Sequence, residues 1–217
     1  MSEYMITTAT LQKGFRAIST AMSKNRDYLV ELDAQNGDGD LGVSMDTGYK
    51  AVVASFHDDK ELDLGRFMLK TSKVFNEASP SSLGTITSFG FMGMAKALKG
   101  KESATLSALA SSMQAGLSLI MEKAGAKPGE KTILDALCPG VATLLEAADA
   151  GDDIKTALQK AANAATFGSE STKQMRSVHG RAAYYGDKSI GILDGGSVVG
   201  RLIFESLAQS ACDASSN

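Results

Sequence analysis

The sequence predicts an all-α fold, an up-and-down antiparallel bundle of about eight helices joined by short loops. Apolar residues recur at helical spacing along most of the chain, whereas alternating strand patterns are scarce. The helical segments are also separated by short breaks rich in proline and glycine. These breaks fall at Pro80, Gly100, Pro128-Gly129, Gly151 and Gly195-Gly196.

The first helix is expected to begin at Thr7 or Thr8, either of which could cap it, and to end near Asp33. The next helix is expected over residues 42–56, and Asp40 could cap its start. The first helix has one apolar face with spacings of three, four and seven residues, made of Leu11, Phe15, Ile18, Met22, Leu29 and Leu32.

Six further helices are expected from the same spacing. Ser81 or Ser82 should cap one of them, Thr132 should cap another, and Pro139 should kink or split the latter. The ten methionines are expected to fill gaps in the core. The six helices are expected over residues 62–78, 82–98, 103–124, 132–148, 152–171 and 197–212.

Composition limits the class of protein. With 217 residues, a hydrophobic fraction of 43% and no linker-like run, the chain is expected to form a single domain over residues 1–217. A net charge of −3 argues against nucleic acid as a partner. No signal peptide and no membrane-spanning apolar run are visible, and Cys138 and Cys212 fit a reducing compartment. We therefore expect a cytoplasmic protein without a membrane partner.

The most informative segment is the acidic, glycine-rich stretch over residues 31–42. Asp33, Asp38 and Asp40 lie within eight positions of one another and are separated by glycines. Carboxylates this close repel one another without a partner, and their oxygens suit Mg²⁺ or Ca²⁺. In extended backbone, Asp38 and Asp40 would face the same ion. A solvated acidic turn is the alternative, since Asp and Gly are ordinary turn residues.

Three better-known motifs do not fit this segment. A G-x-G-x-x-G pattern begins at Gly37, but it follows a helix, and two aspartates stand where a phosphate would bind. An EF-hand that began at Asn36 would have Leu41 and Thr47 in place of its glycine and glutamate. A Walker P-loop ending occurs nowhere in the chain. If phosphate binds here, a metal ion must bridge it to the carboxylates.

Two other segments could contact phosphate. The small-residue turn over residues 78–85 opens a helix whose free N–H groups could hold a phosphate, although a plain N-cap is the more ordinary explanation. Arg181, within the unusual segment 180–191, could pair with phosphate as a planar fork or could be a solvated loop arginine. His57 and His179 have no partner at metal-ligand spacing, so an ordinary surface position is expected for both.

Together these segments resemble one family, the nucleotide-binding L subunit (DhaL) of dihydroxyacetone kinase, from Leu32 to about Gly196. Four motifs in order carry the resemblance. The family's Gly-Asp-Gly-Asp-His-Gly appears as residues 37–42, its Pro-Gly-Asp-Lys-Thr-Met as 128–133, its Gly-Arg-Ala-Ser-Tyr…Ser-Ile-Gly as 180–191, and its Asp-Pro-Gly as 194–196.

The resemblance implies a closed barrel of eight antiparallel helices that holds ADP or ATP at one end. Asp33, Asp38 and Asp40 match the aspartates that hold two Mg²⁺ ions, and the last two are the expected catalytic residues. The remaining matches are implied to contact the nucleotide. Those that line it are Leu41, Gly42, Val43 and Ser44, and the phosphate-side turn is formed by Ala78 and Ser79. Ile133 packs on the base, Arg181 contacts the nucleotide, and the site is closed by Asp194, Gly195 and Gly196.

The resemblance also implies a partner. In the family, a separate K subunit binds the hydroxyketone covalently through a histidine and docks on the nucleotide end. The chain is therefore expected to be a kinase subunit for a small ketose such as dihydroxyacetone, active only with that partner. The phosphoryl donor is either ATP or a phosphotransferase-system protein that recharges bound ADP, and the sequence does not decide between them.

Several positions depart from the family pattern. Leu41 replaces a histidine, Gly195 replaces a proline, and residues 76–81 lack the glycines and the Gly-Pro pair of the family's turn. The three aspartates are unchanged, whereas the nucleotide-binding residues are altered. Two other functions stay open at this point: a non-catalytic regulatory or binding module of the same fold, and a helical bundle with a structural Ca²⁺ site.

Overall fold

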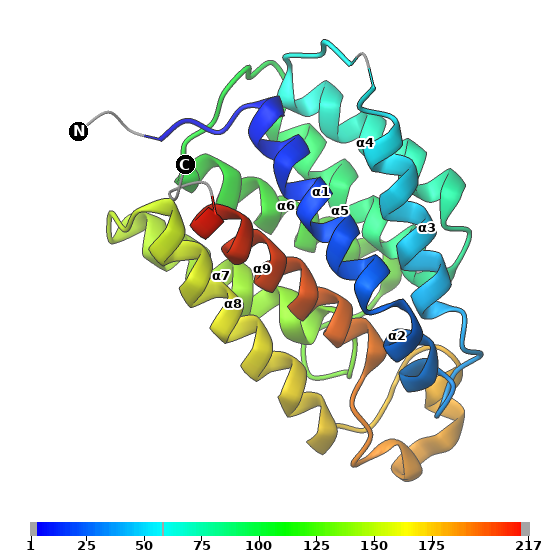
Figure 1. Ribbon diagram of the computed structural model, residues 1–217. Helices are drawn as coiled ribbons and strands as arrows, with labels where there is room; N and C mark the ends of the chain where they lie inside the picture. The colour runs from blue at the N-terminus through cyan, green and yellow to red at the C-terminus, as the bar shows by residue number, and fades with distance from the viewer. Residues whose placement is uncertain (1–3, 58, 214–217) are drawn as a thin grey trace.

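Figure 1 shows a computed structural model of the protein, which describes residues 4–57 and 59–213. Within these residues the backbone is helical apart from loops and one isolated β-bridge between Ile6 and Ala104. The long helices are α1 (Thr8–Lys24), α3 (Leu41–Ala54), α4 (Leu64–Ala78), α5 (Ser82–Leu98), α6 (Leu106–Ala124), α7 (Leu134–Asp149), α8 (Ile154–Ser171) and α9 (Gly195–Asp213). The short elements are α2 (Arg26–Asp33) and the 3₁₀ segments η1 (Thr172–Gln174) and η2 (Arg181–Ser189).

The long helices form a closed ring. Each packs against the next in the order α1, α3, α4, α5, α6, α7, α8 and α9, and α9 packs against α1 to close the ring. Successive helices run in opposite directions (Figure 1), which is why short connections suffice. The predicted all-α, up-and-down closed bundle is therefore confirmed. None of the helices in the described part of the chain is long and apolar enough to cross a membrane.

The helix predicted to run to Asp33 is in fact two helices, α1 and α2. The side-chain amide of Asn25 donates to the Ala21 carbonyl (2.8 Å), and the backbone at Asn25 leaves helical geometry. Asparagine often competes with the helix in this way. The apolar spacing does not reveal the break, because Leu29 and Leu32 are buried after it just as Met22 is before it.

The helix starts match the sequence in part. Thr7 forms a capping box with Thr10 at α1, and the Ser81 hydroxyl accepts a hydrogen bond from the Gly84 N–H (3.1 Å) at α5, as predicted. Asp40 precedes α3, but its side chain makes no capping hydrogen bond, so the predicted cap is wrong. The Asp40 carboxyl group interacts instead with the carboxyl group of Asp38.

Pro139 lies inside α7, which continues to Asp149 without a split. The predicted split is therefore wrong, and the alternative, a kink, stays a prediction. Helix α8 packs closely on this part of α7. A Cβ on Gly168 of α8 would collide with the Asp135 carbonyl and lie 2.8 Å from the Pro139 ring.

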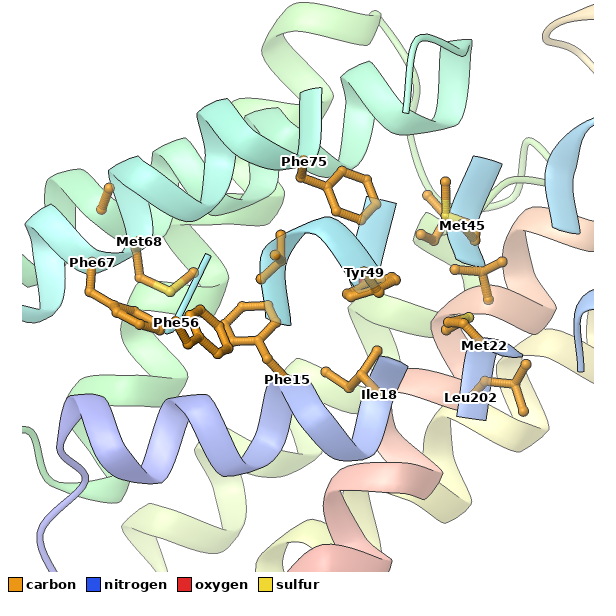
Figure 2. Close-up of a cluster of buried hydrophobic side chains, with 14 of the residues drawn as sticks. Phe15, Ile18, Met22, Met45, Tyr49, Phe56, Phe67, Met68, Phe75 and Leu202 are labelled. Atoms are coloured by element: carbon orange, nitrogen blue, oxygen red, sulfur yellow. The ribbon is translucent and has the colours of Figure 1, made fainter. Parts of the chain in front are cut away.

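Aromatic rings fill the interior between α1, α3, α4 and α5. Figure 2 shows Phe15 of α1 beside Phe56 and near Phe67. The centroid of the Phe15 ring lies 6.0 Å from that of Phe56 and 5.5 Å from that of Phe91. Both pairs are edge-on, a geometry that aromatic pairs prefer. The predicted core-filling role of methionine is confirmed for three residues, which are buried in the same cluster: Met22, Met45 and Met68.

Loops from distant parts of the sequence meet at one end of the barrel (Figure 1). Asp33 ends α2, the loop between α2 and α3 carries Asp38 and Asp40, and the segment between α8 and α9 carries Arg181 and Asp194. The two segments come together because α9 packs against α1 when the ring closes, so the connection between α8 and α9 lies beside the connection between α2 and α3. This end of the barrel contains the residues that the sequence singled out.

We expect Phe15→Ala to lower the free energy of unfolding by about 3–5 kcal/mol, because it removes a buried ring that contacts three others. Urea unfolding followed by circular dichroism measures this. Phe167→Ala is the matched control, since that side chain on α8 is 78% exposed, and it should change stability by well under about 1 kcal/mol. Equal losses in the two variants would contradict this account of the core.

Candidate metal and nucleotide site

The acidic loop folds around the Asp33 carboxylate, at the end of α2. Its Oδ2 atom accepts hydrogen bonds from the Gly39 N–H (2.9 Å) and, at the limit of hydrogen-bond distance, the Leu41 N–H (3.5 Å). Gly39 has φ +74°, a conformation that favours glycine, and a Cβ on Gly37 would collide with the Asp33 carboxylate. The glycines of the motif thus let the loop close tightly on one of its own aspartates.

The same loop brings the three aspartates together. Asp33, Asp38 and Asp40 each offer a carboxylate oxygen, and these atoms lie within 4.8 Å of one another. The Asp33 side chain is half-buried, whereas the other two are exposed. Arg181 supplies positive charge from the distant η2 segment, with its Nη2 atom 2.9 Å from Asp38 Oδ2. Clustered, accessible carboxylate oxygens fit the ligand preference of a hard divalent cation.

Burial raises the pKa of the Asp40 carboxyl group, and the negative charges of Asp38 and Asp33 raise it further. The guanidinium group of Arg181 acts in the opposite direction but does not cancel these effects. The cluster therefore has more negative charge than its surroundings neutralise. A bound cation would relieve that repulsion, so the residues present fit the ion that the sequence predicted.

Leu41 and Gly195 lie against each other where α3 and α9 begin. Leu41 is buried, and a Cβ on Gly195 would come within 2.5 Å of its Cδ2 atom. Leu41 and Gly195, which replace the histidine and the proline of the family pattern, are therefore in contact with each other. Of the other predicted lining residues on α3, Gly42 is buried close to the Arg26 carbonyl, Val43 is exposed, and Ser44 is half-buried.

The remaining closing-turn residues meet the start of α7. A Cβ on Gly196 would lie 3.2 Å from both the Ile133 nitrogen and the Asp194 carboxylate. Ile133 is only 2% exposed and belongs to the core cluster, so its contact with a base stays a prediction. The aspartate cluster, the closing turn and Ile133 therefore form one continuous site.

The predicted phosphate-side turn reaches this site less directly. Ala78 is half-buried at the end of α4. Ser79 is fully buried beside Gly48 of α3, and Gly48 lies about two helical turns along α3 from Asp40. The Ser79 hydroxyl has no hydrogen-bond partner among the described residues. A buried hydroxyl without a partner is unusual in a folded protein. Among the predicted site residues that the structure describes, it is the one with a fully buried side-chain polar atom that lacks a partner.

Residues 35–209 match the family model described as the DAK2 domain. The chain belongs to the DAK2 domain family. Its resemblance to the L subunit, inferred from four motifs, is thereby confirmed. It is 29% identical over 189 residues to "PEP-dependent dihydroxyacetone kinase, ADP-binding subunit DhaL" of Escherichia coli, which covers 87% of this chain and 90% of that relative. A Listeria innocua protein, "PEP-dependent dihydroxyacetone kinase 1, ADP-binding subunit DhaL", is also 29% identical, with coverage of 87% and 89%.

Solved structures show the same DAK2 fold. The native dihydroxyacetone kinase of C. freundii superposes with a TM-score of 0.74 and 23% identity over 93% of this chain and 34% of that one. The same kinase in complex with AMP-PNP and Mg²⁺ has a TM-score of 0.74 and 22% identity over 96% and 35%. The chain thus spans about a third of each of these solved chains.

Asp194 has the most perturbed carboxyl group of this DAK2 site, since burial raises its pKa to about 7. The Ser197 N–H, which donates to its Oδ2 atom at 2.6 Å, and the charge of Lys131 both lower the pKa. The charges of Asp135 and Asp33 raise it. Asp194 therefore caps α9, and its pKa also depends on the charge of Asp33 in the acidic cluster.

Sequence reasoning missed the contacts around the turn over residues 127–132. His179 Nε2 lies 2.6 Å from Glu130 Oε2, a partner that the sequence did not predict, although the side chain is 35% exposed, as expected for a surface position. The pair is 49 residues apart, and no local pattern reveals it. Asp135 accepts the Thr132 N–H (2.7 Å), while the Thr132 hydroxyl accepts the Leu134 N–H (3.2 Å). Helix α7 begins after Ile133 without a side-chain cap, so the predicted cap by Thr132 is wrong.

We expect Asp40→Asn to stabilise the metal-free protein, by on the order of 0.5 kcal/mol, because it removes one of three repelling charges. No capping hydrogen bond is lost with it. Thermal unfolding in chelator measures the gain, and the same measurement with Mg²⁺ should show a smaller ion-induced shift than in the wild type. Asp27→Asn, on the exposed face of α2, is the control and should leave that shift unchanged. If Mg²⁺ raised the unfolding temperature of Asp40→Asn as much as that of the wild type, Asp40 would not be a metal ligand.

We expect stability to fall as pH rises from about 5 to 8 because of Asp194. Its folded-state pKa, about 7, lies above the ordinary value of 3.8, so the folded protein holds this proton more tightly than the unfolded chain. The resulting stability is complete at low pH and is lost as pH rises through 7. Urea unfolding in chelator should show a flatter profile for Asp194→Asn, and identical profiles would contradict the assignment.

Proposed function

We propose that the chain is the ADP-binding, Mg²⁺-dependent subunit of a dihydroxyacetone kinase, and that it transfers a phosphoryl group to a small ketose held by a K-type partner. The observation that carries this function is the cluster of three carboxylates at one end of a DAK2 barrel. Such a cluster has no role in packing, because two of its members are exposed.

Asp33, Asp38 and Asp40 would hold the metal, which we propose to be two Mg²⁺ ions. When bound, Mg²⁺ neutralises phosphate charge and orients the phosphates, which is most of what phosphoryl transfer requires. Arg181 would add a planar set of N–H donors to the phosphates, since its side chain is 68% exposed beside Asp38. Ser79 is fully buried, so its unpaired hydroxyl would reach a phosphate oxygen only after a local rearrangement of the turn.

The rest of the predicted nucleotide contacts shape the site. Leu41 and Gly195 pack against each other at its floor, and Gly196 lies beside Ile133. On this side the nucleotide would contact backbone and apolar surface, with the Asp194 carboxyl group beside Gly196. The other charged groups of the site lie in the acidic loop and η2. We propose that the base lies towards Ile133 and the phosphates towards the aspartates.

The partner would dock on the segment that carries Arg181. Four large apolar side chains are exposed there, and aromatic residues of this kind are enriched at protein interfaces. Tyr184 is the most exposed of them, at 91%. The others are Val178, Tyr185 and Ile190. Docking at this place would cover the nucleotide end and exclude water from the transferring phosphoryl group.

We propose that the phosphoryl donor is a phosphotransferase-system protein that recharges ADP in place. The two relatives above are named PEP-dependent and ADP-binding, and this chain spans 90% and 89% of them. Exchange of ADP for free ATP is the alternative. The cytoplasmic location and the single domain over residues 1–217 stay predictions from the sequence.

Calorimetry and a coupled assay test this function. ADP should bind with Mg²⁺ and lose at least tenfold in affinity in chelator, because the carboxylates would otherwise repel the phosphates. With a K-type partner, dihydroxyacetone and a PEP-driven donor system, the chain should form sugar phosphate. Asp38→Asn should lower that rate at least 100-fold while its circular dichroism spectrum stays unchanged.

The exposed Asp27→Asn variant is the control for the assay and should match the wild type. The chain alone should form no sugar phosphate from ATP, Mg²⁺ and a panel of three- and four-carbon ketoses. Robust turnover without a partner would refute the division of the site between two subunits. ADP affinity that is equal with and without chelator would refute the metal bridge, and would favour a non-catalytic binding module.

A further inference from the structure

Lys131 has two features that the proposed function does not use. Its side chain is buried, with 3% exposure, although lysine is among the residues least often found inside proteins. Its backbone is left-handed, with φ +61°, and among the described residues it is the only one other than glycine with a positive φ. A non-glycine residue keeps such a conformation only when its surroundings hold it there.

The Lys131 ammonium group is bonded to three backbone carbonyls. Its Nζ atom lies 2.6 Å from the Ser189 oxygen, 2.6 Å from the Ile192 oxygen and 3.2 Å from the Met175 oxygen. These bonds use all three of its N–H donors. The three carbonyls lie at the two ends of one segment, residues 175–192, which we term the strap. One buried cation thus ties the beginning of the strap to its end.

Few other bonds hold the strap to the barrel. It is a pair of short 3₁₀ turns joined at Gly186, and most of its side chains are exposed. The Gly191 N–H donates to the Lys173 carbonyl (2.7 Å), and His179 bonds to Glu130 in the turn beside Lys131. Within the strap, the Ser177 N–H donates to the Ser189 hydroxyl (2.9 Å). Adjacent residues of a single turn, Glu130 and Lys131, therefore contact the strap at His179 and at both ends.

The strap carries Arg181, whose guanidinium group lies beside Asp38 of the acidic loop. Arg181 is exposed, and no helix of the barrel supports it. Its location depends on the path of the strap backbone, and that path depends on the carbonyls that Lys131 binds. Asp135 in turn fixes the Lys131 turn, because its carboxylate accepts the Gly129 N–H (2.6 Å) and the Thr132 N–H (2.7 Å).

We infer that Lys131 is a positioning residue: its ammonium group closes the strap and thereby holds the guanidinium group of Arg181 at the acidic cluster. The nucleotide part of this inference rests on the proposed function, whereas the ordering of the strap does not. A lysine that merely filled space in the core would affect the stability of the whole barrel and would have no particular link to Arg181.

Lys131→Gly is the sharpest variant, because glycine suits the left-handed backbone and only the side chain is lost. Lys127→Met is the matched control: it removes an exposed lysine of the same turn, 4.0 Å from Glu130. Circular dichroism and thermal unfolding establish that each variant is folded. Should Lys131→Gly fail to fold, Lys131→Met replaces it, since methionine keeps most of the aliphatic bulk without the charge.

The first measurement is limited trypsin digestion of the full chain, with mass spectrometry of cleavage after Arg181 and Lys188. Loss of the three carbonyl bonds should free the strap and speed cleavage at both sites at least tenfold, while Lys127→Met matches the wild type. This measurement needs no nucleotide. Cleavage at the wild-type rate in a folded Lys131 variant would overturn the inference.

The second measurement is a double-mutant cycle on affinity for ADP with Mg²⁺, using Lys131→Gly, Arg181→Gln and both together. If Lys131 acts through Arg181, each single change weakens affinity about tenfold, and the double variant is weakened by little more. Independent effects that multiply to about 100-fold would overturn the link to Arg181. Wild-type protein that binds no ADP would refute the proposed function, and the trypsin result would still decide the role of Lys131 in the strap.

Discussion

Repulsion among Asp33, Asp38 and Asp40 is the constraint on which the rest of this barrel end depends. Their oxygens lie within 4.8 Å of one another, so the loop that holds them works against its own electrostatics. Two devices keep it closed. Backbone N–H groups of the loop donate to the Asp33 carboxylate, and Arg181 approaches Asp38 from another part of the chain. Neither device is an apolar contact, so the loop depends on polar groups that a ligand could also engage.

Closure of the helical ring brings those groups together. The acidic loop precedes α3 and the strap precedes α9, yet they meet because α9 packs on α1. Close contacts at glycines accompany this arrangement, as at Gly42 beside the Arg26 carbonyl and Gly195 beside the Leu41 side chain. Leu41 and Ile133 belong to the same buried cluster as the aromatic rings, so the site borders the core. Asp194 links the stability of the barrel to the charge of the site, because burial raises the pKa of its carboxyl group.

Local features could be predicted from the sequence, and long-range ones could not. The helices, the caps at Thr7 and Ser81 and the grouping of the three aspartates follow from neighbours a few residues apart. The break at Asn25 was hidden because the apolar spacing continues across it. The Glu130–His179 bond joins residues 49 positions apart, which no periodicity records. The left-handed backbone of Lys131 depends on partners in the strap, so its sequence neighbours could not predict it.

The contact between Leu41 and Gly195 couples two positions of the chain. The motifs of the DhaL family that this chain resembles have histidine at the first position and proline at the second, and this chain differs at both. With leucine in place, the space that a larger residue at position 195 would occupy is already filled. A transplant of the family's closing turn into this chain would therefore meet a neighbour that its original context lacked. The two differences therefore form one packing unit, in which the Leu41 side chain limits the residues that fit at position 195.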